Sequence, residues 1–392
     1  MLMRCCRLKI LINMTVTIKN LHEYLLYFYD NKQLHQFAKT GSYNFIYNIF
    51  FSLDRLFIFR PILIGLISLY AIYRVGSKWA NLVKVSSETI ILNDTCYNFN
   101  NILNVAAESI FIKKNIGVIR DYGGSSLSPK FIVDILKFSI ISAFQCRKFW
   151  FKGSIFLYKT LMESTIFYNV FVAFFENHSS KYTITSCDHS PIASAFIFAS
   201  KKNSKFNIYI QHGLISSLFP PSISDLSIVF DDRSKKFYQR INKSEKTLSM
   251  QINPIENFEV LDRAPNLQMV HREVSPRDIE SFNSIALVLN LHTSYQLVNN
   301  FLNKYKITRS NRVSLIICPH PLTSKYLLGK LSRLGQISNY RAADCELYIC
   351  GNTSSIIELI ACGKTTVYSN CLDNVLDDYY GLVEDKIVNR LQ

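Results

Sequence analysis

The sequence has no internal repeat at a fixed period and no low-complexity stretch, so neither a repeat architecture nor a long disordered segment is expected. It has no zinc-finger spacing, RNA-recognition signature or basic heptad segment, which argues against a dedicated nucleic-acid-binding protein. None of its 10 cysteines belongs to a CxxC pair, and several lie in apolar runs such as ELYIC. We therefore expect small buried cysteines in a reducing compartment, with neither a disulfide framework nor a metal site.

Long uncharged apolar runs are also missing. The longest one between residues 45 and 74 extends from Pro61 to Tyr73, whereas a membrane-spanning helix needs about 20 residues. We expect a buried or interfacial helix here, and peripheral contact with the inner face of the plasma membrane is the open alternative. The N-terminal residues are only weakly signal-like, because a small-residue cleavage site is lacking, and this predicts a cytoplasmic protein.

The sequence has few acidic residues relative to basic ones, with 29 Asp and Glu and 44 Lys and Arg. Its formal net charge is therefore +15. This balance favours an anionic partner such as nucleic acid, a membrane face or a phosphorylated substrate. A lysine-rich composition without functional meaning is the alternative. The length of 392 residues and the hydrophobic content of 48% predict two packed domains.

The hydrophobic pattern divides the chain into five parts. Residues 1–85 have mainly helical spacing. Short β-rich runs alternate with helical patterns over residues 86–245 and again over 283–375, which indicates parallel sheets built from βαβ units. Residues 246–282 are polar and contain several prolines, which predicts a linker, and residues 376–392 are expected to form a closing helix. The predicted fold class is α/β, with two Rossmann-like domains and a mainly helical N-terminal extension.

Strands are expected over residues 89–94, 182–187, 206–213 and 226–232 of the first block, and over 284–291, 313–321, 345–351 and 365–369 of the second. In folds of this kind the ligand lies in the cleft between the two sheets, at the carboxyl ends of the strands. The polar residues that directly follow strands are therefore the candidates for chemistry.

The segment CELYICGNTSSIIELIACG predicts a buried strand, a polar turn and a helix. The strand ends at Gly351, which would shape the loop, and the helix ends at Gly363, a natural C-terminal glycine. Free backbone N–H groups and hydroxyls at the helix start suit a phosphate, with ordinary N-capping as the alternative. Glu358 would either reach a ribose hydroxyl or face solvent. The nucleotide- and phosphate-binding candidates in this segment are Thr353, Ser354, Ser355 and Glu358.

A second segment, SLIICPHPL, ends a strand in two prolines, which cannot extend a central strand. They would hold His320 at the carboxyl end of the strand, where an imidazole donates a hydrogen bond to phosphate, more strongly when protonated. A structural histidine in a turn is the alternative. His320 and Pro321 join the candidate nucleotide-binding residues.

The first block offers candidate bases at the ends of two strands. The segment FNIYIQHG places His212 and Gly213 after one strand, where a glycine permits a turn or a close ligand approach. The segment TSCDHSP places Asp188 and His189 after another strand, and Pro191 is suited to begin the next helix. We expect these acid/base residues to open into the same cleft and to be the catalytic candidates.

The order and spacing of these segments resemble bacterial glycosyltransferases of the GT-B type. The resemblance covers roughly residues 180 to 385. It rests on the segment HGLISSLFPP, the histidine-proline loop, the paired serines and the C-terminal segment DDYYGLVED. The families concerned are the sialyl- and polysialyltransferases and the CDP-glycerol glycerophosphotransferases of capsule and lipopolysaccharide synthesis. The resemblance implies that His320, Ser354 and Ser355 bind the donor phosphate, and that His212 or Asp188 acts as the base.

The same resemblance implies metal-independent, inverting transfer from a nucleotide-sugar to a glycan or lipid-linked glycan, without a bound cofactor. CMP- and UDP-linked sugars are the candidate donors. The chain lacks an obvious acidic-acidic-glycine motif, for which CDHSP is the candidate replacement, and it lacks the tryptophan that precedes histidine-glycine in many glycerophosphotransferases. A polyol-phosphate transferase, a nucleotide-sugar 2-epimerase and a non-catalytic GT-B-like scaffold of a capsule assembly complex are the alternatives.

Overall fold

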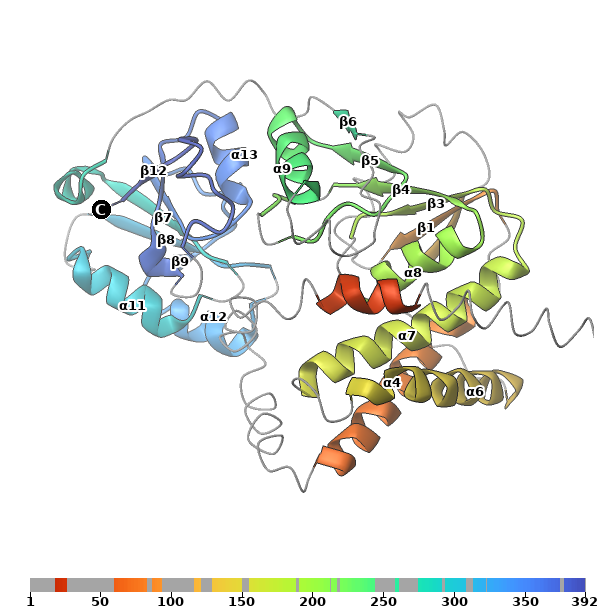
Figure 1. Cartoon of the computed structure of the whole chain (residues 1–392). Helices are drawn as coiled ribbons and strands as arrows, with labels where there is room; N and C mark the ends of the chain where they lie inside the picture. The colour runs from red at the N-terminus through yellow and green to blue at the C-terminus, as the bar shows by residue number, and fades with distance from the viewer. Residues whose placement is uncertain are drawn as a thin grey trace, which may run out of the picture. The chain divides into compact units, whose positions relative to one another are not determined.

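A computed structural model of the chain describes the residues drawn in colour in Figure 1. They are residues 18–26, 60–82, 87–93, 116–120, 129–149, 155–187, 190–211, 213–216, 219–243, 258–260, 274–290, 293–307, 313–321, 323–373 and 377–391. These residues form two compact units. The first contains most of the described residues up to 260, and the second contains those from 274 onward together with residues 213–216.

The first unit is built on a six-stranded sheet in the order β2-β1-β3-β4-β5-β6, with every neighbouring pair parallel. Its strands are β1 (Thr89–Asn93), β2 (Ile116–Arg120), β3 (Tyr182–Thr185), β4 (Phe206–Ile210), β5 (Leu226–Val229) and β6 (Phe258–Val260). The predicted parallel sheet is thus present. One expectation was wrong, because β6 lies inside the segment 246–282 that was predicted to be a linker with little structure. Its Phe-Glu-Val sequence pairs with β5 and extends the sheet.

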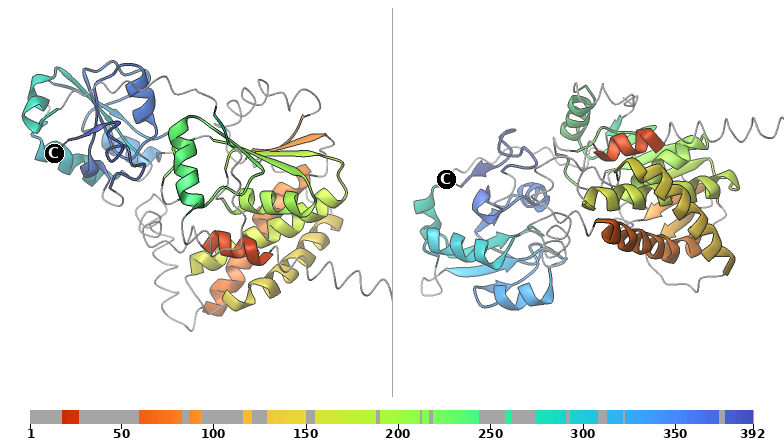
Figure 2. Two further views of the ribbon diagram at one scale, coloured as in Figure 1. Left: turned by 45° about the horizontal axis from the view of Figure 1, so that its top comes forward. Right: turned by 60° about the horizontal axis from the view of Figure 1, so that its bottom comes forward.

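Helices cover one side of this sheet in successive layers, which Figures 1 and 2 show. They are α4 (Arg60–Leu82), α6 (Pro129–Cys146), η2 (Arg147–Phe149), α7 (Ile155–Glu176), α8 (Pro191–Lys202) and α9 (Asp232–Asn242), with a further helix over residues 18–26. Helix α8 packs against β3 and β4, α7 packs on α8, and α4 and α6 pack on α7 and on each other. The N-terminal segment predicted to be helical is therefore helical where it is described, and it belongs to the first unit.

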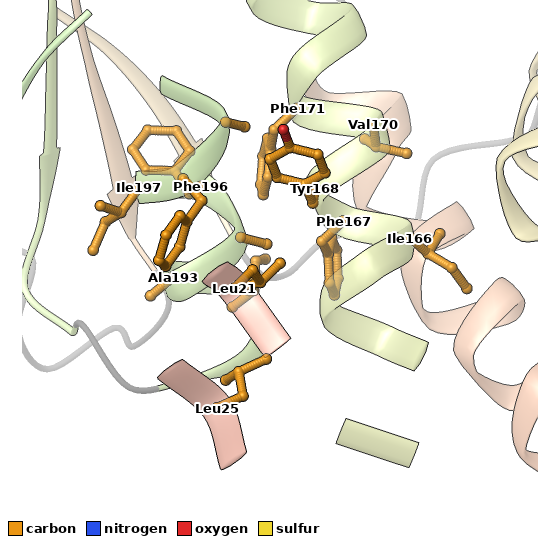
Figure 3. Close-up of a cluster of buried hydrophobic side chains, with 14 of the residues drawn as sticks. Leu21, Leu25, Ile166, Phe167, Tyr168, Val170, Phe171, Ala193, Phe196 and Ile197 are labelled. Carbon is orange, nitrogen blue, oxygen red and sulfur yellow. The ribbon is translucent and has the colours of Figure 1, made fainter. Parts of the chain in front are cut away.

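Helix α7 explains this layering, because it is mostly apolar and is buried on nearly every side, so other helices must cover it. Phe167 and Phe171 on α7 are buried, and Phe171 meets Phe196 of α8 edge-on at 5.2 Å between ring centroids. Leu21, from the helix over residues 18–26, points into the same cluster (Figure 3). No helix among the described residues is long and apolar enough to cross a membrane.

The second unit contains another six-stranded parallel sheet, in the order β12-β11-β10-β7-β8-β9. Its strands are β7 (Ser284–Val288), β8 (Ser314–Cys318), β9 (Gln336–Ile337), β10 (Leu347–Cys350), β11 (Thr366–Tyr368) and β12 (Asn389–Arg390). Its helices are η3 (Pro276–Ser281), α11 (Tyr295–Lys304), α12 (Lys325–Leu331), α13 (Ser355–Ala361) and η4 (Asn370–Leu372). Alternate residues of β7 enter different apolar clusters, with Leu287 in one and Val288 in the other, so both faces of the sheet are buried, as is usual for parallel sheets.

The closing helix expected over residues 376–392 is absent from the described residues 377–391, which form turns and β12. The backbone gives the reason, since Asp378 (φ 43°), Gly381 (φ 63°) and Lys386 (φ 58°) are all left-handed, and a right-handed helix cannot pass through such residues. The Asp378 carboxylate also accepts hydrogen bonds from the backbone N–H groups of Val383 and Glu384, at 3.1 and 2.9 Å. The side chain therefore stabilises a turn in place of a helix.

Candidate functional site

The second sheet has a topological switch point between β7 and β10. Read from β9 to β12, its strands follow the order 3-2-1-4-5-6 of doubly wound dinucleotide-binding folds. In such sheets the chain leaves two neighbouring strands in opposite directions, and a crevice forms beyond their carboxyl ends. Asn290 follows β7, and Gly351, Asn352 and Thr353 follow β10, so these residues lie at the switch point.

A buried polar cluster occupies this edge of the sheet. The Asp373 carboxylate, only 3% exposed, accepts hydrogen bonds on one oxygen, Oδ2, from the side-chain amides of Asn290 (2.5 Å) and Asn352 (2.9 Å). Thr293 Oγ1 lies 3.1 Å from Asn290 Oδ1 and 3.1 Å from the carbonyl oxygen of Leu372. A buried carboxylate without donors would be costly, so Asp373 holds the loops after β7 and β10 together.

His320 lies at the carboxyl end of β8, the strand beside β7. Its backbone carbonyl accepts a hydrogen bond from the backbone N–H of Thr323 at 2.9 Å, and α12 is capped by Ser324, whose hydroxyl accepts from the N–H of Leu327. The imidazole is half-buried, and burial lowers the pKa of His320 below its ordinary value. The neutral imidazole is therefore favoured until an anion arrives to stabilise the charged form. Pro321 is exposed.

The residues at the start of α13 behave differently from one another. Ser354 is exposed, and its side chain makes no capping hydrogen bond. The Thr353 hydroxyl accepts from the Ser355 backbone N–H at 3.4 Å. Ser354 and Ser355 thus lie at the start of α13, as predicted. Because α13 has only seven residues, its N-terminus alone is a weak anion site.

Glu358 is already engaged within the second unit. One carboxylate oxygen accepts from Arg341 Nη2 at 2.8 Å and from the Tyr340 hydroxyl at 2.9 Å. The pair is exposed, so it contributes little to stability. These bonds all fall on Oε2, so contact of Glu358 with a ribose hydroxyl would use the other carboxylate oxygen, Oε1.

The glycines have unequal roles. A Cβ on Gly213 would meet no atom within 4 Å, and φ of Gly213 is not positive, so the backbone there does not require glycine. A Cβ on Gly351 would lie 3.4 Å from Leu372 Cβ and 3.9 Å from Asn290 Nδ2, which are ordinary contact distances, so the packing of the loops does not require glycine there. Gly363, with φ +71°, ends α13 as expected. Its N–H donates to the carbonyl of Ile360, in a Schellman motif.

The strands that precede the candidate bases in the sequence lie at the switch point of the first sheet or beside it. The strand order 2-1-3-4-5 places that point between β1 and β3. Asp188 and His189 directly follow β3 in the sequence, and His212 follows β4, but all three lie outside the described residues. Pro191 begins α8 as expected, and the Ser190 hydroxyl caps this helix by accepting from the Ala193 N–H.

Gln211, which precedes His212, is a structural residue. It is 1% exposed, and its side chain donates to the Ser234 hydroxyl at 3.0 Å and accepts from the backbone N–H of Phe230 at 2.8 Å. These bonds join the end of β4 to the end of β5 and to α9. The next described residues, 213–216, group with the second unit, where Leu214 is buried.

Sequence reasoning missed the polar cluster, although one signal was available. Asn290 ends the predicted strand over 284–291, and Asn352 lies in the polar turn after the predicted strand over 345–351. Neither was chosen, because an amide at a strand end is common, and Asp373 lies in an unremarkable stretch, SNCLDN. What unites them is the strand order, which a single sequence does not display.

Within the described ranges, no group of three or more His, Cys, Asp or Glu side chains is placed to hold a metal ion. Comparison with protein-family models, with curated proteins and with solved structures finds no match for this chain.

Proposed function

We propose that this chain is a glycosyltransferase of the GT-B type that moves a sugar from a nucleotide-linked donor to a growing surface glycan. The observation that carries the proposal is the switch point of the second sheet, where Asp373 and two asparagines form a buried polar cluster beside the His320 loop. A pre-ordered polar edge of this kind suits a nucleotide, because ligands of doubly wound sheets bind beyond the carboxyl ends of the central strands.

In this proposal the second unit binds the donor. The leaving nucleotide gains negative charge as the glycosidic bond to its phosphate breaks, and hydrogen-bond donors aimed at that charge lower the barrier. His320 would donate from its imidazole, and the hydroxyls of Ser354 and Ser355 would assist. Asp373 would act as a positioning residue, because it already holds the loops after β7 and β10.

The first unit would supply the base. An acceptor hydroxyl must lose its proton as it attacks the anomeric carbon, and a positioned base contributes about 10²–10⁴-fold. The proposed candidates are Asp188, His189 and His212. Each comes in the sequence directly after the carboxyl end of a strand of the parallel sheet, which is where ligands bind in such folds. The acceptor would be a glycan or a lipid-linked glycan of the cell surface.

The proposal is tested by thermal stability in the presence of nucleotides. Purified protein would be melted with CMP, CDP, UDP and GDP and with their common sugars, beside His320→Ala. A nucleotide at 100 times its Kd stabilises by about 2.7 kcal/mol, and loss of a charge-assisted hydrogen bond costs about 1.5–3 kcal/mol. We expect one nucleotide class to raise the Tm of the wild type. The Kd for that nucleotide, derived from the Tm shift, should be at least about tenfold higher in His320→Ala.

His178→Ala, in the first unit after α7, is the matched histidine control and should retain the full nucleotide response. If no nucleotide stabilises the wild type at millimolar concentration, the donor-binding proposal fails. If a nucleotide binds but no donor sugar is turned over with any glycan acceptor, the chain is a non-catalytic scaffold and the enzymatic part of the proposal fails.

A further inference from the structure

The outer helices of the first unit expose an unusual amount of apolar surface. Of the thirteen large hydrophobic side chains that are exposed among the described residues, ten lie on α4 and α6. On α4 they are Ile62, Leu66, Leu69, Tyr70 and Tyr73, and on α6 they are Val133, Leu136, Ile140, Ile141 and Phe144. Their spacing of three and four residues places them in one stripe along each helix. We call the two stripes together the apolar face.

The opposite side of each helix is accounted for by packing on α7. Leu63 and Ile67 of α4 are buried in the main cluster of the first unit. On α6 the buried residues are polar or small, and Asn169 of α7 donates to the hydroxyl of Ser142 at 3.0 Å and to Gln145 Oε1 at 3.2 Å. The inner side of α6 is therefore mixed, because Phe138, Ala143 and Cys146 pack on the same apolar cluster, whereas large apolar side chains line its outer side. A helix facing only water has the reverse pattern, so the apolar face is built for a non-aqueous contact.

Basic groups border the apolar face at the end of α6. A cavity of about 590 Å³ lies between the end of α6 and the helix over residues 18–26. Its lining includes Lys19, Arg147 and Lys148, together with Phe144 and Gln145 of α6. Arg147 and Lys148 are exposed on η2, directly after α6. Lys19 is 57% exposed and also pairs with Glu23 at 3.5 Å. Three basic side chains thus lie around Phe144, the last residue of the α6 stripe.

Further features of this surface match a bilayer. Tyr70 and Tyr73 are exposed on α4, and Lys159 lies 5.4 Å from the ring centroid of Tyr70. Lys137 is exposed on α6, whose one acidic residue, Asp134, is half-buried. Tyrosines and basic residues beside an apolar stripe are typical of helices that lie in the membrane interface. The charge is complementary to anionic headgroups, which also fits the formal net charge of +15.

We infer that the apolar face of α4 and α6 docks on an anionic lipid bilayer, with Lys19, Arg147 and Lys148 binding headgroup phosphates. The leucine, isoleucine and aromatic side chains enter the boundary between headgroups and acyl chains, and the helices lie in the plane of the surface. The inference is independent of the proposed transferase activity. If both hold, the protein works at the surface where a lipid-linked acceptor is displayed.

The test is co-sedimentation of the full chain with vesicles. Vesicles of phosphatidylcholine with one third phosphatidylglycerol are compared with pure phosphatidylcholine, at 0.1 M salt. Each cation near an anionic surface contributes a factor of about five to binding, so Arg147→Ala with Lys148→Ala should weaken partitioning roughly thirtyfold on the anionic vesicles alone. Leu69→Ser with Phe144→Ser should weaken it at least about tenfold, since both side chains leave water on docking.

Tyr326→Ser is the control, because Tyr326 is the most exposed of these apolar side chains at 74% and lies on α12 of the second unit. It should bind vesicles like the wild type, and all variants should keep the wild-type melting profile because the changed side chains are exposed. Equal binding to neutral and anionic vesicles, or equal loss in Tyr326→Ser, overturns the inference. The inference is also overturned if the wild type fails to bind vesicles. If light scattering then shows a dimer that the double variant Leu69→Ser with Phe144→Ser dissociates, the apolar face joins two copies of the chain.

Discussion

His22 provides a prediction whose size follows from the structure. Its ring is 2% exposed, its Nε2 lies 2.8 Å from the hydroxyl of Thr165, and it meets Phe149 edge-on at 5.4 Å between ring centroids. Thr165 gives its own proton to the carbonyl of Leu161 at 2.6 Å, so the histidine donates from Nε2 and its neutral form fits the site. Burial lowers the pKa of His22 from 6.5 to about 3, and the charge of Lys148 adds to the effect.

The sign follows from proton linkage. Between the two pKa values the unfolded chain binds a proton that the folded protein does not, so stability falls as the pH drops below about 6.5. At pH 5 the loss is about 1.5 pH units times 1.36 kcal/mol, or about 2 kcal/mol relative to pH 8. This figure is insensitive to the exact folded pKa, because the folded protein stays unprotonated at His22 at pH 5 for any pKa well below 5.

The assay is urea unfolding of wild type and His22→Gln at pH 8 and pH 5. Both tryptophans, Trp79 and Trp150, belong to the sequence of the first unit, so tryptophan fluorescence follows that unit. Other groups titrate in both proteins alike, and only the difference between the two proteins matters. We expect the stability advantage of the wild type to shrink by about 2 kcal/mol at pH 5. An advantage that changes by less than about 0.5 kcal/mol would refute the assignment of His22 as a buried neutral group.

Three further outcomes are expected. Asp373→Ala should destabilise the second unit by about 3 kcal/mol, because two buried amides lose their acceptor, and calorimetry would show it; an unchanged melt would contradict the role of the cluster. Nucleotide affinity should rise between pH 8 and pH 6 in the wild type but not in His320→Ala, because burial lowers the pKa of His320 and phosphate binding must recharge it. In alkylation at pH 8 followed by peptide mass spectrometry, exposed Cys362 should react well before Cys318, whose pKa burial raises to about 12; equal rates would contradict this burial.

Much of the fold could be predicted from the sequence, because its strands are short apolar runs between polar turns. Every strand expected over the two alternating blocks has a counterpart among the described strands, and α8 begins at Pro191 and α13 ends at Gly363 as expected. The expectation of buried cysteines is confirmed for Cys146, Cys187, Cys318, Cys345 and Cys350, but it is wrong for Cys362, which is exposed, and Cys371 is only half-buried. These features depend on local chemistry, which a single sequence displays.

Two of the failures come from contacts that are distant in the sequence, and one comes from local backbone geometry. Strand β6 has three residues, and only its pairing with β5 makes it a strand. The C-terminal segment has helical spacing, yet the Asp378 side chain and left-handed residues fix it as turns. The polar cluster joins Asn290 to Asp373 across 83 positions of the chain. Strand β6 and the polar cluster follow from the strand order, and the strand order arises only when the chain has folded.

The burial of α7 has a consequence for how this protein can be divided. Tyr158, Phe167 and Phe171 of this helix are almost inaccessible to water, because α8 lies on one flank and α4 and α6 on others. A fragment starting at residue 86 would remove α4 and the helix over residues 18–26, and would expose part of the apolar surface of α7 to water, which favours aggregation. The N-terminal residues thus belong to the first folding unit, and fragments for expression should begin before residue 18.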